Sequence, residues 1–306
     1  MVNMDHQKIL IVLMQIKYIL DQLLIIQKQV NYKQNHHYLQ VKLGLLMNLN
    51  ILIMYRPRVI PVLLIDLIGE AVKTTHFNKR MYLGDPVNTV SLFNAFKVDE
   101  LVLLHIDSCD PKFQINYDLL FDISQEAKMP FAIGGGIKTL EEIRKILSLG
   151  AEKVVLSKSA IENPSFLKEA VDRFGSSSIT VCIDVKKNIF GKYVVYIHKK
   201  KTTLDLNECL DLVGDYQAGE LIIQSISQDG KMSGYDKNLV RYVSDYMPIP
   251  VVALGGASSL NDMSKLISET YASAFAAGSM FVFQDNKKGV LINYPSENDL
   301  LELCIM

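Results

Sequence analysis

The stretch PFAIGGGIKTLEEI, residues 130–143, is the strongest indication of the fold of this protein, because a similar stretch occurs 120 residues later. PVVALGGASSLNDM, residues 250–263, has an apolar run, a group of glycines and an amphipathic segment in the same order. A buried strand that leads through a glycine turn into a helix is the unit of a parallel β/α fold. Two copies at one offset therefore predict that the chain repeats a larger block of such units.

The offset of 120 residues also relates segments on either side of this pair. DELVLLHID at residues 99–107 aligns with GELIIQSIS at residues 219–227, and 157–159 aligns with 277–279. Four strand–helix units, repeated at constant spacing, predict a closed (β/α)8 TIM barrel with an internal twofold half-barrel repeat. A doubly wound open sheet is the alternative, although it does not require such a repeat. The predicted strands are 59–65, 101–106, 131–133, 154–156, 179–183, 221–226, 251–254 and 273–277, and helical patterns cover 140–149, 164–174, 206–216, 238–246 and 260–268.

The length of the chain exceeds what one barrel requires. A (β/α)8 barrel needs about 250 residues, and residues 56–306 account for 251 of the 306. Residues 1–55 contain no proline and one glycine, whereas all nine prolines lie in 56–306. This change predicts an N-terminal extension outside the fold. Its longest uncharged apolar run, 9–16, is too short for a transmembrane helix, which needs about 20 residues.

Composition argues against several classes of partner. The net charge is −1, and the densest basic run is Lys199–Lys201, which is too small a footprint for binding nucleic acid. The four cysteines are far apart and form neither a disulfide framework nor a zinc motif. The sequence thus predicts a cytoplasmic protein without a metal or a cofactor, and without a membrane or nucleic acid partner.

Two glycine-rich clusters follow predicted strands, one in each half. Barrel enzymes work at the C-terminal ends of their strands, where glycine turns expose backbone N–H groups to phosphate. Tight turns that require glycine are the alternative explanation for either cluster alone. Because the repeat relates the two clusters, they predict a long substrate with a phosphate at each end. The first cluster is Gly134–Gly136 with Ser157–Ser159, and the second is Asp229–Gly230 with Gly255–Gly256 and Gly278–Ser279.

One acidic residue stands at the end of a central predicted strand, where proton transfer would take place. Asp184 ends the fifth strand in VCID, and we expect it to act as a general acid or base. A structural hydrogen bond is the alternative. Its mate at offset 120 is Leu64, which cannot transfer a proton. Asp66 lies two residues further along, with the same strand parity but deeper in the following loop.

The opposite ends of the strands carry a second set of charges. Four residues stand where the first, second, fourth and sixth strands begin, so their side chains are expected to meet as a ring that closes the bottom of the barrel. An ordinary stabilising ion network is the alternative interpretation. The four residues are Arg58, Glu100, Lys153 and Glu220.

In combination, these residues resemble the cyclase subunit of imidazole glycerol phosphate synthase. The resemblance implies a half-barrel duplication that takes ammonia from a glutaminase docked on the N-terminal face of the barrel. It also implies the lyase step of histidine biosynthesis, in which a bis-phosphorylated ribulosyl-aminoimidazole-carboxamide ribotide becomes imidazole glycerol phosphate and aminoimidazole carboxamide ribotide. The matching motifs run from Arg56 nearly to the C-terminus and include RVIP (58–61), GDPV (84–87), GGGIKTLEE (134–142), VCIDVK (181–186) and QDGKMSGYD (228–236).

The resemblance carries roles over to individual positions. Asp184 matches one catalytic aspartate, and Lys73 in GEAVK matches the functional lysine of a mobile first loop. The four residues at the strand beginnings match the ammonia gate. The phosphate-binding positions are Gly135, Gly136, Ser157 and Lys158 in the first cluster, and Asp229, Gly230, Gly256, Gly278 and Ser279 in the second.

Several positions depart from the family pattern. Leu64 occupies the place of the first catalytic aspartate, and Asp66 could replace that aspartate only through a two-residue insertion. His105 stands where cyclases usually carry an aspartate. Lys158 replaces a small hydroxyl residue.

Other segments resemble a paralogous branch that is associated with amidation of surface-polysaccharide (O-antigen) sugars. Members of that branch are thought to pass ammonia from a glutaminase to an ATP-dependent sugar amidotransferase. The sequence therefore favours an ammonia conduit, with an active cyclase that uses Asp66 as the alternative. The segments are PVLLI (61–65), MYLGDPVNTVSLFN (81–94), IDVKKNIFGKYVVY (183–196) and GVLINYPS (289–296).

Overall fold

The computed structural model describes residues 56–75, 77, 79–198, 200, 202–284 and 289–303. The predicted N-terminal extension, 1–55, lies outside these residues. Residues Pro57–Leu300 form one compact unit, and this unit contains the barrel. None of the helices in the described ranges is both long and apolar enough to cross a membrane.

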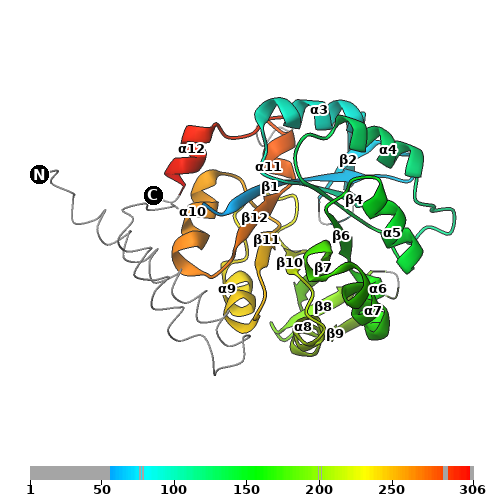
Figure 1. Cartoon of the computed structure of the whole chain (residues 1–306). Coiled ribbons are helices and arrows are strands. Elements are labelled where there is room, and N and C mark those ends of the chain that lie inside the picture. The colour runs from blue at the N-terminus through cyan, green and yellow to red at the C-terminus, as the bar shows by residue number, and fades with distance from the viewer. Residues whose placement is uncertain are drawn as a thin grey trace, which may run out of the picture. The chain divides into compact units, whose positions relative to one another are not determined.

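Eight parallel strands close into a barrel (Figure 1), which confirms the predicted (β/α)8 fold. Each strand pairs with its neighbours in chain order, and the last strand pairs with the first through Arg58↔Ala274 and Val59↔Phe275. The strands are β1 (Arg58–Ile65), β4 (Leu101–His105), β5 (Phe131–Gly134), β6 (Lys153–Leu156), β7 (Ile179–Lys187), β10 (Glu220–Ser225), β11 (Val251–Leu254) and β12 (Ala274–Ala277).

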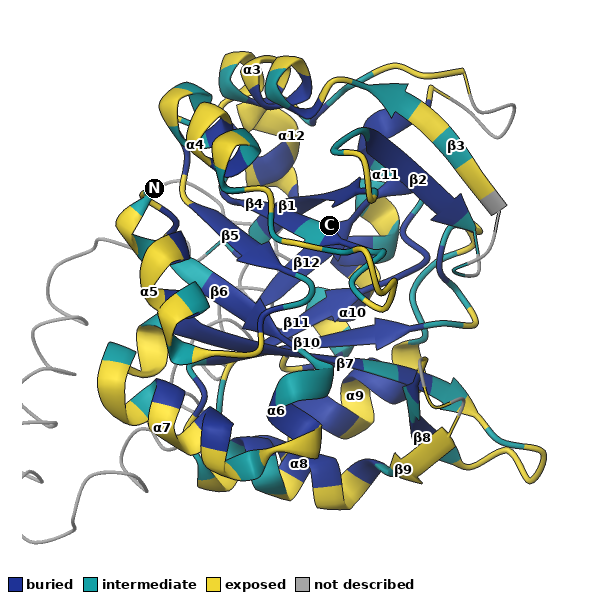
Figure 2. Ribbon diagram, turned by 90° about the vertical axis from the view of Figure 1, so that its right-hand side faces the viewer, coloured by how far each residue is buried: buried dark blue, intermediate teal, exposed yellow. Residues whose placement is uncertain are grey.

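Helices surround the strands and turn their exposed faces outward (Figure 2). The repeat extends to their caps: Glu142 accepts a hydrogen bond from the backbone N–H of Thr139, and Asp262 accepts one from Ser259 in the equivalent place. The helices are α3 (Pro86–Phe96), α4 (Tyr117–Glu126), α5 (Leu140–Ser148), α6 (Lys158–Glu162), α7 (Pro164–Phe174), α8 (Leu206–Asp215), α9 (Lys237–Tyr246), α10 (Leu260–Glu269), α11 (Ser279–Val282) and α12 (Glu297–Glu302), with a short 3-10 turn at Ser176–Ser178.

Two antiparallel hairpins follow β1 and β7, the equivalent strands of the two halves, and the sequence patterns did not predict them. The first is formed by β2 (Ala71–Thr75) and β3 (Lys79–Gly84), and the second by β8 (Tyr193–Ile197) and β9 (Thr202–Asp205). Both continue a barrel strand beyond its C-terminal end, through Ile65↔Ala71 and Val185↔Val195. They therefore place additional side chains above the mouth of the barrel.

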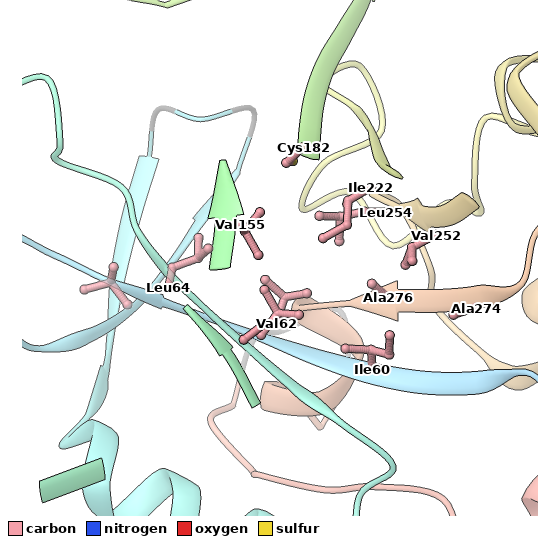
Figure 3. Close-up of a cluster of buried hydrophobic side chains, with 13 residues drawn as sticks. Ile60, Val62, Leu64, Val155, Cys182, Ile222, Val252, Leu254, Ala274 and Ala276 are labelled. Atoms are coloured by element: carbon pink, nitrogen blue, oxygen red, sulfur yellow. The ribbon is translucent and has the colours of Figure 1, made fainter. Parts of the chain in front are cut away.

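Alternate residues of each barrel strand face the interior, where apolar side chains fill the barrel (Figure 3). Ile60, Val62 and Leu64 contribute from β1, whereas Leu63 and Ile65 are buried on the other face of the sheet. The interior is a packed core, as expected for eight strands. The other interior side chains are Val72, Val102, Ala132, Val155, Cys182, Ile222, Val252, Leu254, Ala274 and Ala276.

Candidate functional site

The four charged residues predicted at the strand beginnings meet at the N-terminal end of the barrel. The guanidinium of Arg58 binds both Glu100 and Glu220. On the other side, Lys153 Nζ lies 3.0 Å from Glu100 Oε1 and 3.3 Å from Glu220 Oε2. Two cations and two carboxylates thus alternate in a closed ring with no net charge. Figure 1 shows the strands that bring these residues together.

Burial makes this ring more than a surface ion network. The side chains of Glu100 and Glu220 are 6% and 9% exposed, while Arg58 retains 33% exposure. Burial acts to lower the pKa of Arg58, but the charges of Glu220 and Glu100 outweigh it and raise the pKa above its ordinary value. The four groups are therefore paired in one cluster at this end of the barrel, in which only the two basic side chains are partly exposed.

The interior next to the ring is apolar. Ile60, Val102, Val155 and Ile222 each lie two residues beyond a ring member on the same strand, so they face the interior directly behind the ring. A charge is costly to bury among such side chains, whereas a small neutral molecule is not. The interior behind the ring therefore disfavours an ion relative to a small neutral molecule.

Asp184 lies at the opposite, C-terminal end of the barrel. Burial, together with the nearby charge of Asp229, raises the pKa of Asp184 to about 7. His198, from the end of β8, places Nε2 4.0 Å from Asp184 Oδ2. Burial and then the charge of Lys186 lower the pKa of His198. A carboxylic acid whose pKa is near neutral can donate or accept a proton, as the sequence prediction requires.

A pocket adjoins this end of the barrel and is lined by residues of the second glycine cluster, including Gly230, Gly256 and Gly278. Lys73 lies across it, buried, with Nζ 3.6 Å from Asp229 Oδ1. A Cβ atom at Gly278 would come within 2.8 Å of Lys73 Nζ, so the lysine contacts the glycine turn directly.

Two polar atoms in this pocket are buried without a hydrogen-bond partner, Asp229 Oδ2 and Ser279 Oγ. The ammonium group of Lys73 and the Ser279 hydroxyl suit an anionic group, while the carboxylate of Asp229 suits a hydroxyl or a cation. Lys73 lies in the connection after β1, where the resemblance places a mobile loop, and this connection folds into the hairpin to which β2 belongs.

The first glycine cluster forms a turn after β5. Gly135 and Gly136 have φ values of +93° and +81°, and a Cβ atom at either would overlap the His105 carbonyl oxygen or the Phe113 ring. Close packing therefore requires both glycines, whatever they bind. Ser157 precedes α6, and Lys158 Nζ pairs with Glu162 at 3.6 Å.

The two positions at which a second acid could be expected have different surroundings. Leu64 is buried in the interior, in register with Leu104 and Val72 (Figure 3). Asp66 follows the strand, and its Oδ1 accepts hydrogen bonds from the backbone N–H groups of Ile68 and Glu70 at 3.1 and 2.9 Å. The Asp66 carboxylate thus stabilises the turn into β2.

His105 lies outside the mouth of the barrel. Its side chain has the strand parity of Leu101 and Leu103, which are buried on the outer face of the sheet. Burial lowers the pKa of His105 to about 4, and neither ring nitrogen has a hydrogen-bond partner. At neutral pH this residue is therefore an uncharged packing group against Phe113.

Apart from Lys73, sequence reasoning missed the residues that the hairpins supply. The ring of Phe77, at the tip of the first hairpin, contacts His198 of the second, with ring centroids 4.8 Å apart. The ring of Tyr196 also packs against His198, with ring centroids 4.6 Å apart. Arg80 of β3 binds Asp107, which follows β4. Only the equal spacing of the segments after β1 and β7 could have indicated that the two hairpins meet.

A closed (β/α)8 barrel made of two like halves, with glycine turns over one end and a charged ring at the other, is the class of protein that this fold and site define. The chain belongs to the histidine biosynthesis protein family, whose model matches residues 58–287.

Individual relatives agree with this family. A protein of Leptospira borgpetersenii, provisionally named imidazole glycerol phosphate synthase subunit HisF, is 42% identical over 80% of this chain and 98% of its own length. A Vibrio vulnificus protein, provisionally named subunit hisF3, is also 42% identical over 80% of this chain and 95% of its own. Imidazole glycerol phosphate synthase subunit HisF of Alkaliphilus metalliredigens is 35% identical over 76% and 92%.

Proposed function

We propose that this protein accepts ammonia from a glutaminase subunit at the N-terminal face of its barrel and relays it to the C-terminal face. The observation that carries the proposal is the closed ring of Arg58, Glu100, Lys153 and Glu220, in which both carboxylates are buried. Rotation of one side chain, such as Lys153, would open the ring toward the interior. The apolar interior behind it favours passage of the neutral molecule.

The proposed destination of the ammonia is an ATP-dependent amidotransferase that acts on a surface-polysaccharide sugar. Leu64 supports this destination, because it removes a proton-transferring group from the position that mirrors Asp184. A positioned acid or base contributes about 10²–10⁴-fold to a rate, so a cyclase without it would be severely slowed. An ammonia conduit has no such requirement.

The pocket and the glycine turn at the C-terminal face support binding of a phosphorylated small molecule in this proposal. Lys73 and Ser279 would bind one phosphate, and the turn of Gly135, Gly136 and Ser157, with Lys158 beside it, would bind a second. Lys158 would first have to leave Glu162.

The second candidate function is the cyclase reaction of histidine biosynthesis. The pKa of Asp184, raised to about 7, favours it, because that group could serve as its acid or base. Asp66 would have to serve as the other one, and this requires its carboxylate to give up the two backbone hydrogen bonds of its own turn.

Turnover of the bis-phosphorylated ribulosyl-aminoimidazole-carboxamide ribotide separates the two functions. We expect the purified protein, with its glutaminase partner and with added ammonium salt, to convert this substrate at a negligible rate. Turnover at an ordinary enzymatic rate that Asp66→Asn abolishes would establish the cyclase instead. Failure of any glutaminase to co-purify would remove the basis for both.

A further inference from the structure

The hydroxyl group of Thr180, in β7, is buried inside the barrel wall without a hydrogen-bond partner. Thr180 is 2% exposed, and its Oγ1 contacts neither a donor nor an acceptor. Thr180 belongs neither to the charged ring nor to the lining of the pocket at the C-terminal face. Its position relative to both therefore decides what the hydroxyl can do.

The side chain of Thr180 faces the barrel interior. Cys182, two residues along β7, belongs to the interior cluster (Figure 3), and residues two apart on a strand point to the same side. The partners of Thr180 in register are Glu220 of β10 and Val155 of β6. Glu220 belongs to the charged ring and Val155 to the apolar interior, so the hydroxyl lies where the ring gives way to the interior.

An unpaired hydroxyl at this place is unfavourable for the empty protein. A buried hydroxyl without a partner loses the hydrogen bonds that it makes with water, whereas valine has nearly the same shape and carries no such penalty. Valine also occupies the neighbouring position on β6, where Val155 is in register with Thr180. A small molecule that supplies the missing hydrogen bond would therefore explain why a hydroxyl is present at this position.

The other unpartnered buried side-chain atoms in the described ranges belong elsewhere. Thr74 lies on the first hairpin, Asp229 and Ser279 line the pocket at the C-terminal face, and His105 packs on the outer face of the sheet. Thr180 thus differs from the rest because its side chain lies next to the ring and faces the barrel interior.

We propose that Thr180 is a hydrogen-bonding station for ammonia immediately behind the charged ring. The inference rests on the proposed conduit function and names a further residue of it. The Thr180 hydroxyl donates to the nitrogen lone pair of ammonia or accepts from one of its N–H groups, and no proton is transferred. Ammonia that leaves the polar ring therefore keeps one hydrogen bond before it enters the apolar interior, and this lowers the barrier to entry.

The test compares nitrogen transfer in the complete assembly of this protein, its glutaminase and the acceptor amidotransferase. Glutamine labelled with 15N in its amide group is supplied together with a large excess of unlabelled ammonium, and the 15N content of the aminated product is measured. We expect product of the wild-type protein to be mainly 15N-labelled. Thr180→Val should lower the glutamine-dependent rate about fivefold, which corresponds to one neutral hydrogen bond, while Thr180→Ser should retain it.

A matched control separates this effect from a loss of stability. Thr270, at the end of α10, is also buried, but its hydroxyl donates to Leu266 O at 2.8 Å. Thr270→Val should therefore lower the melting temperature and leave the 15N content unchanged. Thr180→Val should not lower the melting temperature, because it removes a hydroxyl that has no partner. It should instead lower the 15N content of the product.

The possible failures are distinguishable. Wild-type product with the isotope content of the bulk ammonium would overturn the conduit itself. Labelled wild-type product with an equal rate from Thr180→Val would overturn the role of Thr180 and leave the conduit in place. A lower melting temperature for Thr180→Val, with Thr180→Ser equally slow, would mean that Thr180 acts in packing alone.

Discussion

Removal of Glu100 should show how strongly the charged ring holds the barrel together. Glu100 binds Arg58 and accepts hydrogen bonds from Lys153 Nζ at 3.0 and 3.2 Å. Glu100→Ala leaves two cations to share Glu220, so the ring acquires one net positive charge. Loss of one partner from a fully buried ion pair costs about 3–5 kcal/mol. Because Arg58 is partly exposed, water offsets some of this cost, and we expect about 2–3 kcal/mol.

This loss is measurable by thermal denaturation. For a domain of this size each kcal/mol lowers the melting temperature by about 2–4 °C, so Glu100→Ala should lower it by about 5–10 °C and still fold at 25 °C. Glu141→Ala is the matched control. Glu141 pairs with Arg144 at 3.3 Å, but its side chain is 71% exposed, and such a pair contributes about 0.5 kcal/mol or less.

The same variant tests the ring as an ammonia gate. With its glutaminase partner, Glu100→Ala should still hydrolyse glutamine but release most of the ammonia to solvent instead of delivering it. Equal melting temperatures for Glu100→Ala and Glu141→Ala would refute the argument from burial. Unchanged glutamine-dependent product formation would refute the assignment of the gate.

Three further predictions follow from burial at other positions. The pKa of Asp184 in the folded state is raised to about 7, so between about pH 4 and 7 only the unfolded chain is ionised at this residue and the folded state loses stability as pH rises across that interval. Asp184→Asn should therefore raise the melting temperature at pH 8 more than at pH 5, and an equal shift at both would contradict this. His105 stays neutral down to about pH 4 in the folded state, so the free energy of unfolding falls as pH drops from 6.5 to 4. His105→Leu should reduce this fall by up to about 3 kcal/mol, measured by urea titration at each pH. Parallel pH profiles of the variant and the wild type would contradict this prediction. Gly135→Ala would bring a Cβ atom into the His105 carbonyl oxygen, whereas Gly150→Ala, also at positive φ, meets nothing within 4 Å. Gly135→Ala should lower the free energy of unfolding by about 3 kcal/mol or more, and Gly150→Ala by about 1 kcal/mol. Equal losses would show that φ strain alone matters.

The two ends of the barrel use the half-barrel repeat differently. At the N-terminal end, the mates Glu100 and Glu220 are both retained, and both serve in one ring. At the C-terminal end, Asp184 keeps its carboxylate while its mate is Leu64. The matched pair of glutamates belongs to the ring that the proposed conduit requires, whereas the unmatched Asp184 lies at the end where a cyclase would need two acids.

The sequence alone determined the architecture. The 120-residue offset and the apolar runs located all eight barrel strands, because a strand buried on both faces leaves a continuous apolar signal. The places of the charges along the chain also indicated that they share one end of the barrel, because residues at the start of parallel strands lie at the same edge. These residues are Arg58, Glu100, Lys153 and Glu220.

Tertiary structure decided which of these side chains touch and which charges persist. Arg58 and Glu220 are 162 residues apart, and only closure of the barrel joins them. The hairpins after β1 and β7 have short, mixed patterns, and pairing with the barrel strands is what makes them strands and brings Lys73 to Asp229 and His198 to Asp184. Burial and neighbouring charge set the pKa of Asp184, and both are properties of the packed barrel mouth, to which segments far apart in the chain contribute.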